Sequence, residues 1–307
     1  MTASASPISP APAGPAVRRP VRGRSWTADR SPLTGFLLAL PMIVLIAVFA
    51  IYPFIKLITV ALGPPDGLGN IGDFFGNPGN VRALRITFVD SAIVTAVTLV
   101  VGGAVAWRLR TTQRTAIKAL LWGATLLPVL MGSVVKLYAL TSLLGTRRGA
   151  INGTLSSLGL TDEPLQLLYT QFAVVFGMTY QMLPFAVLPL YAAFRTIDLD
   201  LVAAAESLGA RRGRALLSIV APLSLPNVFA TAALVYVVSI GFFLTPVVLG
   251  GATSPFIAAL ISQDVFQFFN VPAAAMGSLV LLVGGLAILI VVYRLVGRDR
   301  LTRAVAR

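Results

Sequence analysis

The sequence predicts an all-α, polytopic membrane protein with six transmembrane helices. Of its 307 residues, 57% are hydrophobic and only 11% are charged, and the mean hydropathy is +0.87. A water-soluble domain needs far more charge than this to cover its surface. In addition, apolar runs recur along the chain, each close to the roughly 20 residues that a helix needs to cross a bilayer.

The charge balance and the missing residue types narrow the function. The net charge is +13, which in a chain this apolar indicates basic loops that set membrane topology rather than a nucleic-acid partner. The chain has no His and no Cys. This excludes disulfides, thiolate and imidazole metal sites, and Ser-His or Cys-His nucleophiles. We therefore expect no metal site and no catalytic residue.

The N-terminal residues 1–32 are rich in Ala, Pro and Ser, carry five Arg and contain no apolar run. This composition predicts a disordered cytoplasmic tail. A signal peptide is the alternative, but the apolar run that follows, Leu33–Ile55, is too long for the apolar core of a signal peptide. We interpret this run as the first span.

The other five spans are expected in the remainder of a transmembrane domain at residues 33–297, before a basic cytoplasmic tail at 298–307. A Gly/Pro/Asn-rich loop is expected at Gly63–Asn80 and a turn-rich loop at Gly145–Pro164. The expected spans are Phe88–Trp107, Ala119–Leu144, Leu167–Ala193, Leu225–Leu249 and Ala273–Val296.

The basic residues predict the orientation in the membrane. With the N-terminus inside, the inside segments carry eighteen of the 24 Lys and Arg residues and the outside loops carry five. Because Lys and Arg are retained on the cytoplasmic side, both termini and the polar segment around residue 210 are predicted to be cytoplasmic. The five outside residues are Lys56, Arg82, Arg85, Arg147 and Arg148.

That polar segment, residues 198–226, lies between the fourth and fifth spans. Its central part, Leu201–Pro226, reads LVAAAESLGARRGRALLSIVAPLSLP. Gly209 is expected to form the turn between two short helices, and the small side chains of 203–205 would let another protein approach closely. A plain connecting loop would explain the arginines but not the small face, the glycine or the closing prolines. The pattern therefore favours a docking surface.

The segment also resembles the EAA loop of the membrane subunits of bacterial ABC importers, in which E-A-A is followed three residues later by G. Ala204, Ala205 and Gly209 match this pattern, whereas Ala203 stands where the glutamate is usual and Glu206 is the nearest acid. The resemblance implies that residues 198–226, hereafter the coupling loop, contact an ATPase subunit. The residues implied to make the contact are Ala203, Ala204, Ala205, Glu206, Gly209 and Ala210.

The resemblance extends over about residues 33–296 and narrows to importer permeases of the polyamine (spermidine/putrescine) type. Within this pattern Lys136 stands where an arginine is usual, and no acid precedes Phe243 where one is common. Five stretches carry the resemblance in order: LLPVLMGSVVKLYAL at Leu126–Leu140, GAINGTLSSLGL at Gly149–Leu160, YQMLPFAVLPLYAAFRTIDLDL at Tyr180–Leu201, FFLTPVVLGG at Phe242–Gly251 and NVPAAAMGSL at Asn270–Leu279.

Polar residues inside the spans are candidates for the translocation path. Lys136 interrupts an apolar run, so its ammonium either faces a cavity or snorkels to the outer surface. Asp90, near the outer end of its span, is either an interface anion or a ligand group, and pairing of Asp90 with Lys136 is a further possibility. Tyr138 is a further candidate beside Lys136. Tyr180 and Gln181 are expected at mid-membrane, where a water-lined path or helix–helix contact would satisfy them.

Three polar residues in the last outer loop, Gln263, Asp264 and Gln267, are expected on one face of a short helix. That face is either simply solvated or a contact for a solute-binding protein. The resemblance implies delivery of solute by such a protein.

No glycine-rich phosphate-binding loop is present, because none of the three lysines follows a glycine. We therefore expect no cofactor in this chain, with ATP and magnesium bound by a partner. The function implied is the permease subunit of an ATP-driven importer of a small polar or charged, polyamine-like solute. Its implied partners are two ATPase subunits, a second and different permease chain, a binding protein and the lipid of the bacterial inner membrane.

Two alternatives remain. A self-sufficient secondary transporter or channel would need ionisable groups deep in the spans, and a membrane-bound enzyme would need the catalytic side chains that are missing. Whether an ATPase copurifies with the chain separates these functions.

Overall fold

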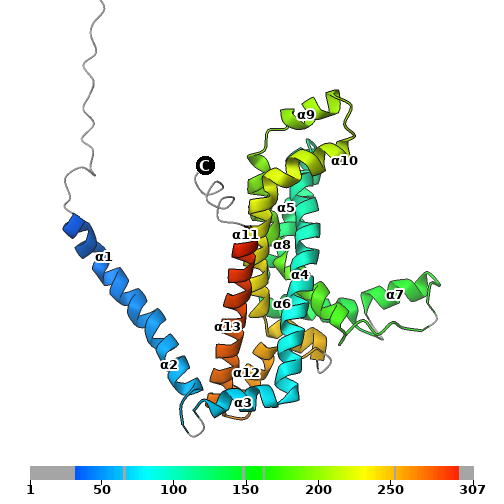
Figure 1. Ribbon diagram of the computed structural model, residues 1–307. Helices are drawn as coiled ribbons and strands as arrows, with labels where there is room; N and C mark the ends of the chain where they lie inside the picture. Colours follow the sequence, from blue (N-terminus) through cyan, green and yellow to red (C-terminus); the bar gives the residue numbers. More distant parts are fainter. Residues whose placement is uncertain (1–31, 65–66, 147–148, 162, 252–253, 297–307) are drawn as a thin grey trace, which may run out of the picture. The chain divides into compact units, whose positions relative to one another are not determined.

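The computed structural model describes residues 32–64, 67–146, 149–161, 163–251 and 254–296 (Figure 1). The chain divides after Pro53 into two compact units, and each is described by itself. The predicted tails lie outside the described residues, except for Pro32. Helix α1 (Pro32–Ile46) begins the first unit and continues through the π-helical turn η1 (Ala47–Ile51) into α2 (Tyr52–Ala61). Residues Leu38–Ala61 are long and apolar enough to cross a membrane, in agreement with the predicted first span.

The second unit is entirely helical in the part of the chain that the structure describes. Its helices are α3 (Gly69–Gly76), α4 (Pro78–Thr111), α5 (Thr115–Leu130), α6 (Ser133–Leu144), α7 (Ala150–Ser157), α8 (Gln171–Arg195), α9 (Asp200–Ser207), α10 (Arg212–Ala215), η2 (Leu216–Val220), α11 (Ala221–Ile240), η3 (Pro246–Gly250), α12 (Ile257–Phe266) and α13 (Val271–Val296).

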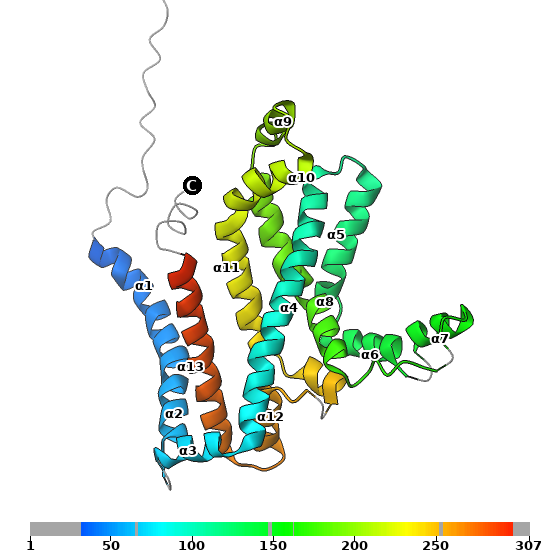
Figure 2. The same cartoon turned by 45° about the vertical axis from the view of Figure 1, so that its right-hand side comes forward.

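Helices α4, α8 and α11 pack side by side and form the core of this unit (Figure 2). Side chains from all three helices are fully buried between them, including Val94, Met178 and Val235. Helices α4 and α8 approach closely at Gly102 of α4, where an added Cβ atom would lie 2.9 Å from the Cβ of Ala186 in α8. Only glycine fits between the two helices at this point.

Helix α4 is longer than the predicted second span because its first turn is well capped. The side chain of Asn77 accepts a hydrogen bond from the backbone N–H of Gly79 at 2.8 Å, and Pro78 occupies the first helical position, where a missing N–H costs nothing. The helix therefore begins ten residues before Phe88, inside the segment predicted to be a loop. Helix α3 lies in the same segment and α7 in the second predicted loop. Both segments were predicted without helices, and each contains one.

The largest correction concerns the third span, which was predicted as one continuous helix at Ala119–Leu144. The chain instead forms α5 and α6, which meet at an angle of 114°. Met131 and Gly132 adopt extended conformations between them, and Pro128, which lacks an N–H, lies in the last turn of α5. The described residues thus contain five helices able to span a membrane, or six if α5 and α6 count as one broken span.

The predicted fifth span was placed too late. Helical structure runs continuously over Gly213–Ile240 and ends at a turn before η3, so Leu225–Leu249 is not one helix. The predicted fourth and sixth spans agree with α8 and α13 to within a few residues.

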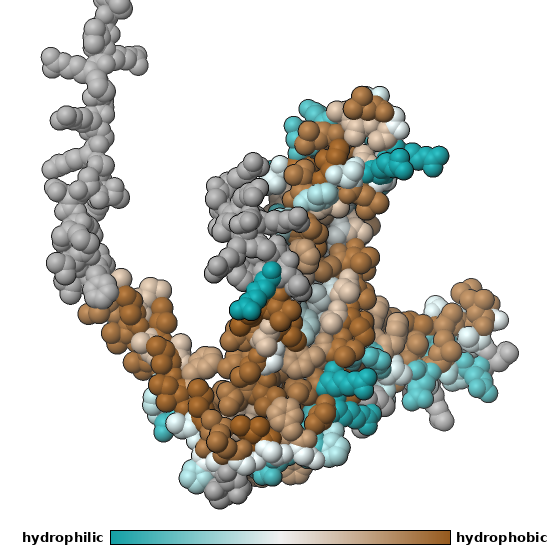
Figure 3. Space-filling view, viewed as in Figure 1, coloured by the Kyte–Doolittle hydropathy of each residue, from teal (hydrophilic) through white to brown (hydrophobic). Residues whose placement is uncertain are grey.

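The second unit has two distinct ends. Helices α9 and α10 cover one end, whereas α3 and α12 lie at the opposite end (Figures 1 and 2). Between them the surface is mostly hydrophobic (Figure 3), and large apolar side chains such as Val283 and Leu286 of α13 are more than half exposed. Such a surface fits contact with lipid chains.

Candidate functional site

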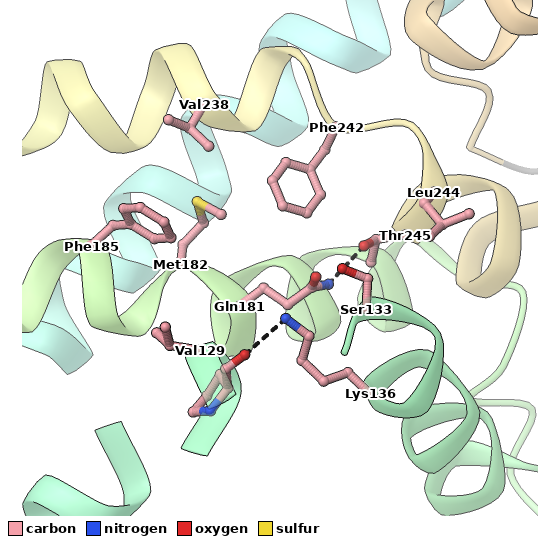
Figure 4. A pocket seen from close by; sticks show the side chains of 11 residues that line it. Val129, Ser133, Lys136, Gln181, Met182, Phe185, Val238, Phe242, Leu244 and Thr245 are labelled. Atoms are coloured by element: carbon pink, nitrogen blue, oxygen red, sulfur yellow. Dashed lines mark hydrogen bonds between the residues drawn. The ribbon is translucent and has the colours of Figure 1, made fainter. Parts of the chain in front are cut away.

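A cavity of about 280 Å³ lies where the α5–α6 break faces α8 and the end of α11 (Figure 4). This volume is at the lower end of the about 300–1,000 Å³ that pockets for drug-sized ligands occupy. The polar side chains at its wall are Ser133, Lys136, Gln181 and Thr245. The apolar ones, besides Pro128, are Val129, Met182, Phe185, Val238, Phe242 and Leu244.

The cavity lies between the two ends of the bundle and is open on one side, where Val129 and Phe185 of its wall are 58% and 43% exposed. Gln181 is about 15 Å along α8 from the start of that helix, and Pro128 is about 20 Å along α5 from Thr115, at a rise of about 1.5 Å per residue. Two of the predicted path residues, Lys136 and Gln181, are therefore brought together here from different helices.

The position of Lys136 follows from the break in the third span. Because the chain leaves the helix after Leu130, the carbonyl of Pro128 is among the last four of α5, which have no partner within a continuing helix. The Nζ of Lys136 donates to this carbonyl oxygen at 2.8 Å (Figure 4). A cation is also favoured at the negative end of a helix dipole. The ammonium is thus half-buried beside the cavity and does not snorkel to a surface.

Gln181 joins α8 to the segment after α11. Its Nε2 donates to the Oγ1 of Thr245 at 2.7 Å, and both residues are buried, at 7% and 1% exposure. Close packing nearby depends on Gly177, because an added Cβ atom at that position would collide with the side chain of Leu249. The amide of Gln181 therefore fixes one wall of the cavity.

Asp90 is not part of this cavity. It is 1% exposed, and its Oδ1 accepts a hydrogen bond from the Nε2 of Gln171 at 2.6 Å. Its Oδ2 has no partner among the described residues. The possible pair of Asp90 and Lys136 is absent, since Asp90 contacts Gln171 and Lys136 contacts Pro128.

The two tyrosines also lie elsewhere. Tyr138 follows Lys136 on α6 but is 77% exposed, and Tyr180 packs against a cluster formed by Leu137, Leu140 and Leu144. Neither lines the cavity. Sequence reasoning did not select Phe242 and Thr245, although both fall in the FFLTPVVLGG stretch that carried the resemblance.

The coupling loop folds as the predicted pair of short helices, α9 and α10, joined at Gly209. Gly209 has φ +89°, a backbone conformation that other residues adopt only at a cost. Its N–H donates to the carbonyl of Glu206 at 3.0 Å, and the N–H of Ala210 donates to the carbonyl of Ala205 at 3.0 Å. These two bonds form a Schellman motif, which closes the end of α9.

The outer face of this turn is open. Ala203, Ala204 and Glu206 are exposed, and Ala205 and Ala210 are half-buried against the core. Leu208 at the tip is 89% exposed, and sequence reasoning did not select it. An apolar side chain this exposed at the end of a membrane protein, next to small residues, is suited to burial by another protein.

At the opposite end, Gln263 and Gln267 are exposed and Asp264 is half-buried. Burial raises the pKa of the Asp264 carboxyl. Gln263 and Asp264 lie on α12 as predicted, whereas Gln267, which was predicted to share that helix, follows its last residue. Sequence reasoning did not anticipate the three phenylalanines around them, Phe266, Phe268 and Phe269, which are 75%, 67% and 80% exposed.

The fold matches that of a solved membrane transporter. The chain superposes with a TM-score of 0.72 on a subunit of a bacterial alginate ABC transporter, solved in complex with an alginate pentasaccharide-bound periplasmic protein. The two are 18% identical, and the match covers 87% of this chain and 95% of that one. The fold is thus that of a membrane subunit of ABC importers.

Sequence comparison makes the assignment specific. Residues 163–300 match the family described as binding-protein-dependent transport system inner membrane component. The spermidine/putrescine transport system permease protein PotB of Escherichia coli (strain K12) is 32% identical over 199 residues, covering 64% of this chain and 72% of that protein. PotB of Haemophilus influenzae is 30% identical over 232 residues, covering 75% and 79%.

The chain belongs to this family of inner-membrane components. It is therefore a multi-pass permease subunit of a binding-protein-dependent ABC importer, as the sequence resemblance implied. ATP is used by a partner ATPase and not by this chain.

Proposed function

We propose that this chain forms one part of the path by which a small polar or charged solute enters the cell. It pairs with a second, different permease chain, binds two ATPase subunits on the cytoplasmic side and receives solute from a binding protein outside. The coupling loop and both termini face the cytoplasm. The eighteen-to-five distribution of basic residues supports this orientation.

The coupling loop transmits the motion of the ATPase. Its docking face consists of Leu208 with the small and polar residues around it, namely Ala203, Ala204, Ala205, Glu206, Gly209 and Ala210. ATP binding closes the ATPase pair, α9 moves with it, and the spans open outward. Such coupling requires that the loop contact the two ATPase states differently, because equal contact would shift no equilibrium.

The observation that carries the proposal is the exposure of Leu208 at the tip of a closed Schellman turn. Nothing in the fold of this chain requires an apolar side chain there. Burying it against a partner would stabilise a complex by about 1.5–3 kcal/mol, whereas leaving it in water gives no gain.

Solute passes through the cavity at Lys136 and Gln181. Asp90, Tyr138 and Tyr180 stay predictions as path residues, since the cavity of this chain is built without them. The relatives are spermidine/putrescine permeases by name, which supports a polyamine-like, small polar or charged solute. The binding protein delivers it at Gln263, Asp264 and Gln267, where the exposed phenylalanines supply apolar contact area.

Copurification of the ATPase tests the coupling role. In Leu208→Ala we expect the fraction of permease that carries ATPase to fall about ten- to a hundredfold at limiting concentration, the equivalent of the lost apolar contact. The permease itself should unfold at an unchanged temperature, because Leu208 makes little contact within the chain.

Leu158→Ala is the matched control. Leu158 is 71% exposed at the end of α7, far along the chain from the coupling loop, and its replacement should leave ATPase binding intact. Wild-type copurification in Leu208→Ala, or an equal loss in both variants, would contradict the docking role. Solute flux through vesicles holding the purified chain alone, without ATP, would favour a secondary transporter or channel instead.

A further inference from the structure

The connection between α8 and the coupling loop is short and held by local hydrogen bonds. Only residues 196–199 separate the end of α8 from the start of α9. The N–H groups of Thr196 and Ile197 donate to carbonyls in the last turn of α8, at 3.2 and 3.4 Å. The N–H of Asp200 donates to the Oδ1 of Asp198 at 3.0 Å, as in an Asx turn. These bonds restrict the angle between α8 and α9.

Apolar packing joins the coupling loop to the same end of the bundle. Val202 of α9 and Ala215 of α10 are buried in one cluster with Phe194 and Ile197. The same cluster continues along α8 into its interface with α4, where it includes Met178. The coupling loop therefore shares its core with the bundle. Because protein interiors are close-packed and deform little, we expect elements that share a core to move together.

Two residues near the end of α4 contact Phe194. The Nε of Arg110 donates to the carbonyl oxygen of Phe194 at 3.4 Å. This carbonyl is one of the last four of α8, which have no partner further along the helix, and a cation is favoured at this end of the helix dipole. The ring of Trp107 meets that of Phe194 edge to face, with centroids 5.6 Å apart and planes at 88°. Both the backbone and the side chain of Phe194 are thus held by α4.

These contacts identify positioning residues for coupling. Without them, bending at residues 196–199 would absorb the motion of α9, and α4 and α8 would stay in place. We propose that Arg110 and Trp107 hold the coupling loop in a fixed position relative to α4 and α8, so that motion of the ATPase reaches the outer ends of both helices. This inference rests on the proposed function, in which the ATPase moves α9, and it identifies the residues through which the motion passes.

The test uses nucleotide alone and needs no solute. Since the chain has no Cys, introduced cysteines accept spin labels without background from this chain. Leu201→Cys labels the start of α9, and Phe172→Cys labels the outer end of α8. Both side chains are exposed, and neither belongs to the docking face. In the complex with cysteine-free partner subunits, the distance between the two labels is measured with ADP and with ATP trapped by vanadate.

With Arg110 and Trp107 in place, we expect the same distance in both nucleotide states. In Arg110→Met, ATP should shift molecules to a second distance. Loss of a hydrogen bond to a charged group should favour the uncoupled arrangement about tenfold or more. Trp107→Leu should act in the same direction. Arg110→Lys, which keeps a cationic donor, should retain the single distance. Arg110→Gln replaces Arg110→Met if that variant does not accumulate.

Arg108→Met is the matched control, because Arg108 is exposed on the same helix two residues away. It should behave as the chain with Arg108 does, and the ATPase should copurify equally with every variant. An ATP-dependent distance with Arg110 and Trp107 in place, or one unchanged distance in Arg110→Met and Trp107→Leu, would overturn the proposal. So would a lower unfolding temperature as their only effect, which would show a purely structural role. Failure of any ATPase to copurify with the wild-type chain would instead refute the proposed function.

Discussion

Substitution of Gly209 tests whether the turn transmits motion to the spans. A small side chain here strains the backbone without colliding with any neighbour. An added Cβ atom would meet no heavy atom within 4 Å, but φ is +89°. Gly209→Ala therefore costs only the strain of a non-glycine residue in this conformation, about 1–2 kcal/mol. A cost of this size lowers the population of the turn about 5- to 30-fold relative to competing conformations. The ratio of molecules with the α9–α10 geometry to molecules without it would fall by the same factor.

Gly213 gives the matched control. It lies four residues away in α10, also has nothing within 4 Å of an added Cβ atom and has no positive φ. Gly213→Ala should be neutral or slightly stabilising, since Ala is the better helix former. Gly209→Asn should transport an amount of solute per ATP between those of wild type and Gly209→Ala, because Asn tolerates this conformation better. Gly209→Glu adds a bulky charge to the docking face and should show the largest loss of solute uptake per ATP.

The assay is solute uptake per ATP hydrolysed by the complete importer in vesicles. We expect Gly209→Ala to reduce this ratio severalfold at unchanged membrane abundance, because the turn lies outside the packed core. The order Gly213→Ala, Gly209→Asn, Gly209→Ala, Gly209→Glu should hold from least to most affected. Equal ratios for Gly209→Ala and Gly213→Ala would refute the reasoning that the positive-φ turn transmits the motion.

Two further predictions concern the packing of the bundle, and unfolding in detergent measures both. Gly102→Ala should lose about 1–3 kcal/mol of stability by overpacking against Ala186. Gly103→Ala is the control and should be tolerated, because the nearest atom to its Cβ would be 3.9 Å away. Equal losses in the two variants would argue against the close contact. Thr245→Val should lose about 1–3 kcal/mol by leaving the buried amide of Gln181 without this acceptor, and adding Gln181→Leu should recover part of the loss. Purely additive losses would show that the bond is not a stabilising unit.

The sequence predicted most of the spans and the pair of short helices in the coupling loop because both depend on local information. Apolar runs of sufficient length specify membrane helices whatever their neighbours are. The turn at Gly209 is likewise local: one residue without a Cβ atom, between two helix-forming stretches, adopts the conformation that closes α9. The Schellman bonds involve only residues 205–210.

The break between α5 and α6 could not be read in the same way. Pro128 and Gly132 interrupt a run that stays apolar throughout, so hydropathy gives no sign of the turn. Prolines at 184 and 189 lie inside α8 without breaking it. Whether a membrane helix ends at such a point depends on what satisfies the carbonyls left unpaired in its last turn, and here Lys136 donates to that of Pro128.

The cavity depends on that break, and so it was predicted only in parts. Lys136 and Gln181 were each identified as unusual polar groups in apolar runs, but their convergence requires the direction that α6 takes after Gly132. Asp90 had the same signal in sequence and has a different neighbour, Gln171. Tertiary contact alone distinguishes these cases.

The absent side chain at Gly102 limits how such a bundle can move. The backbones of helices α4 and α8 lie close together at that point. If one helix slid or rolled along the other, their atoms would collide. Helices α4 and α8 are therefore expected to move together as a rigid unit. Movement is then expected at the bend after α5 and at the turn after α11 instead. Both segments border the cavity that contains Lys136.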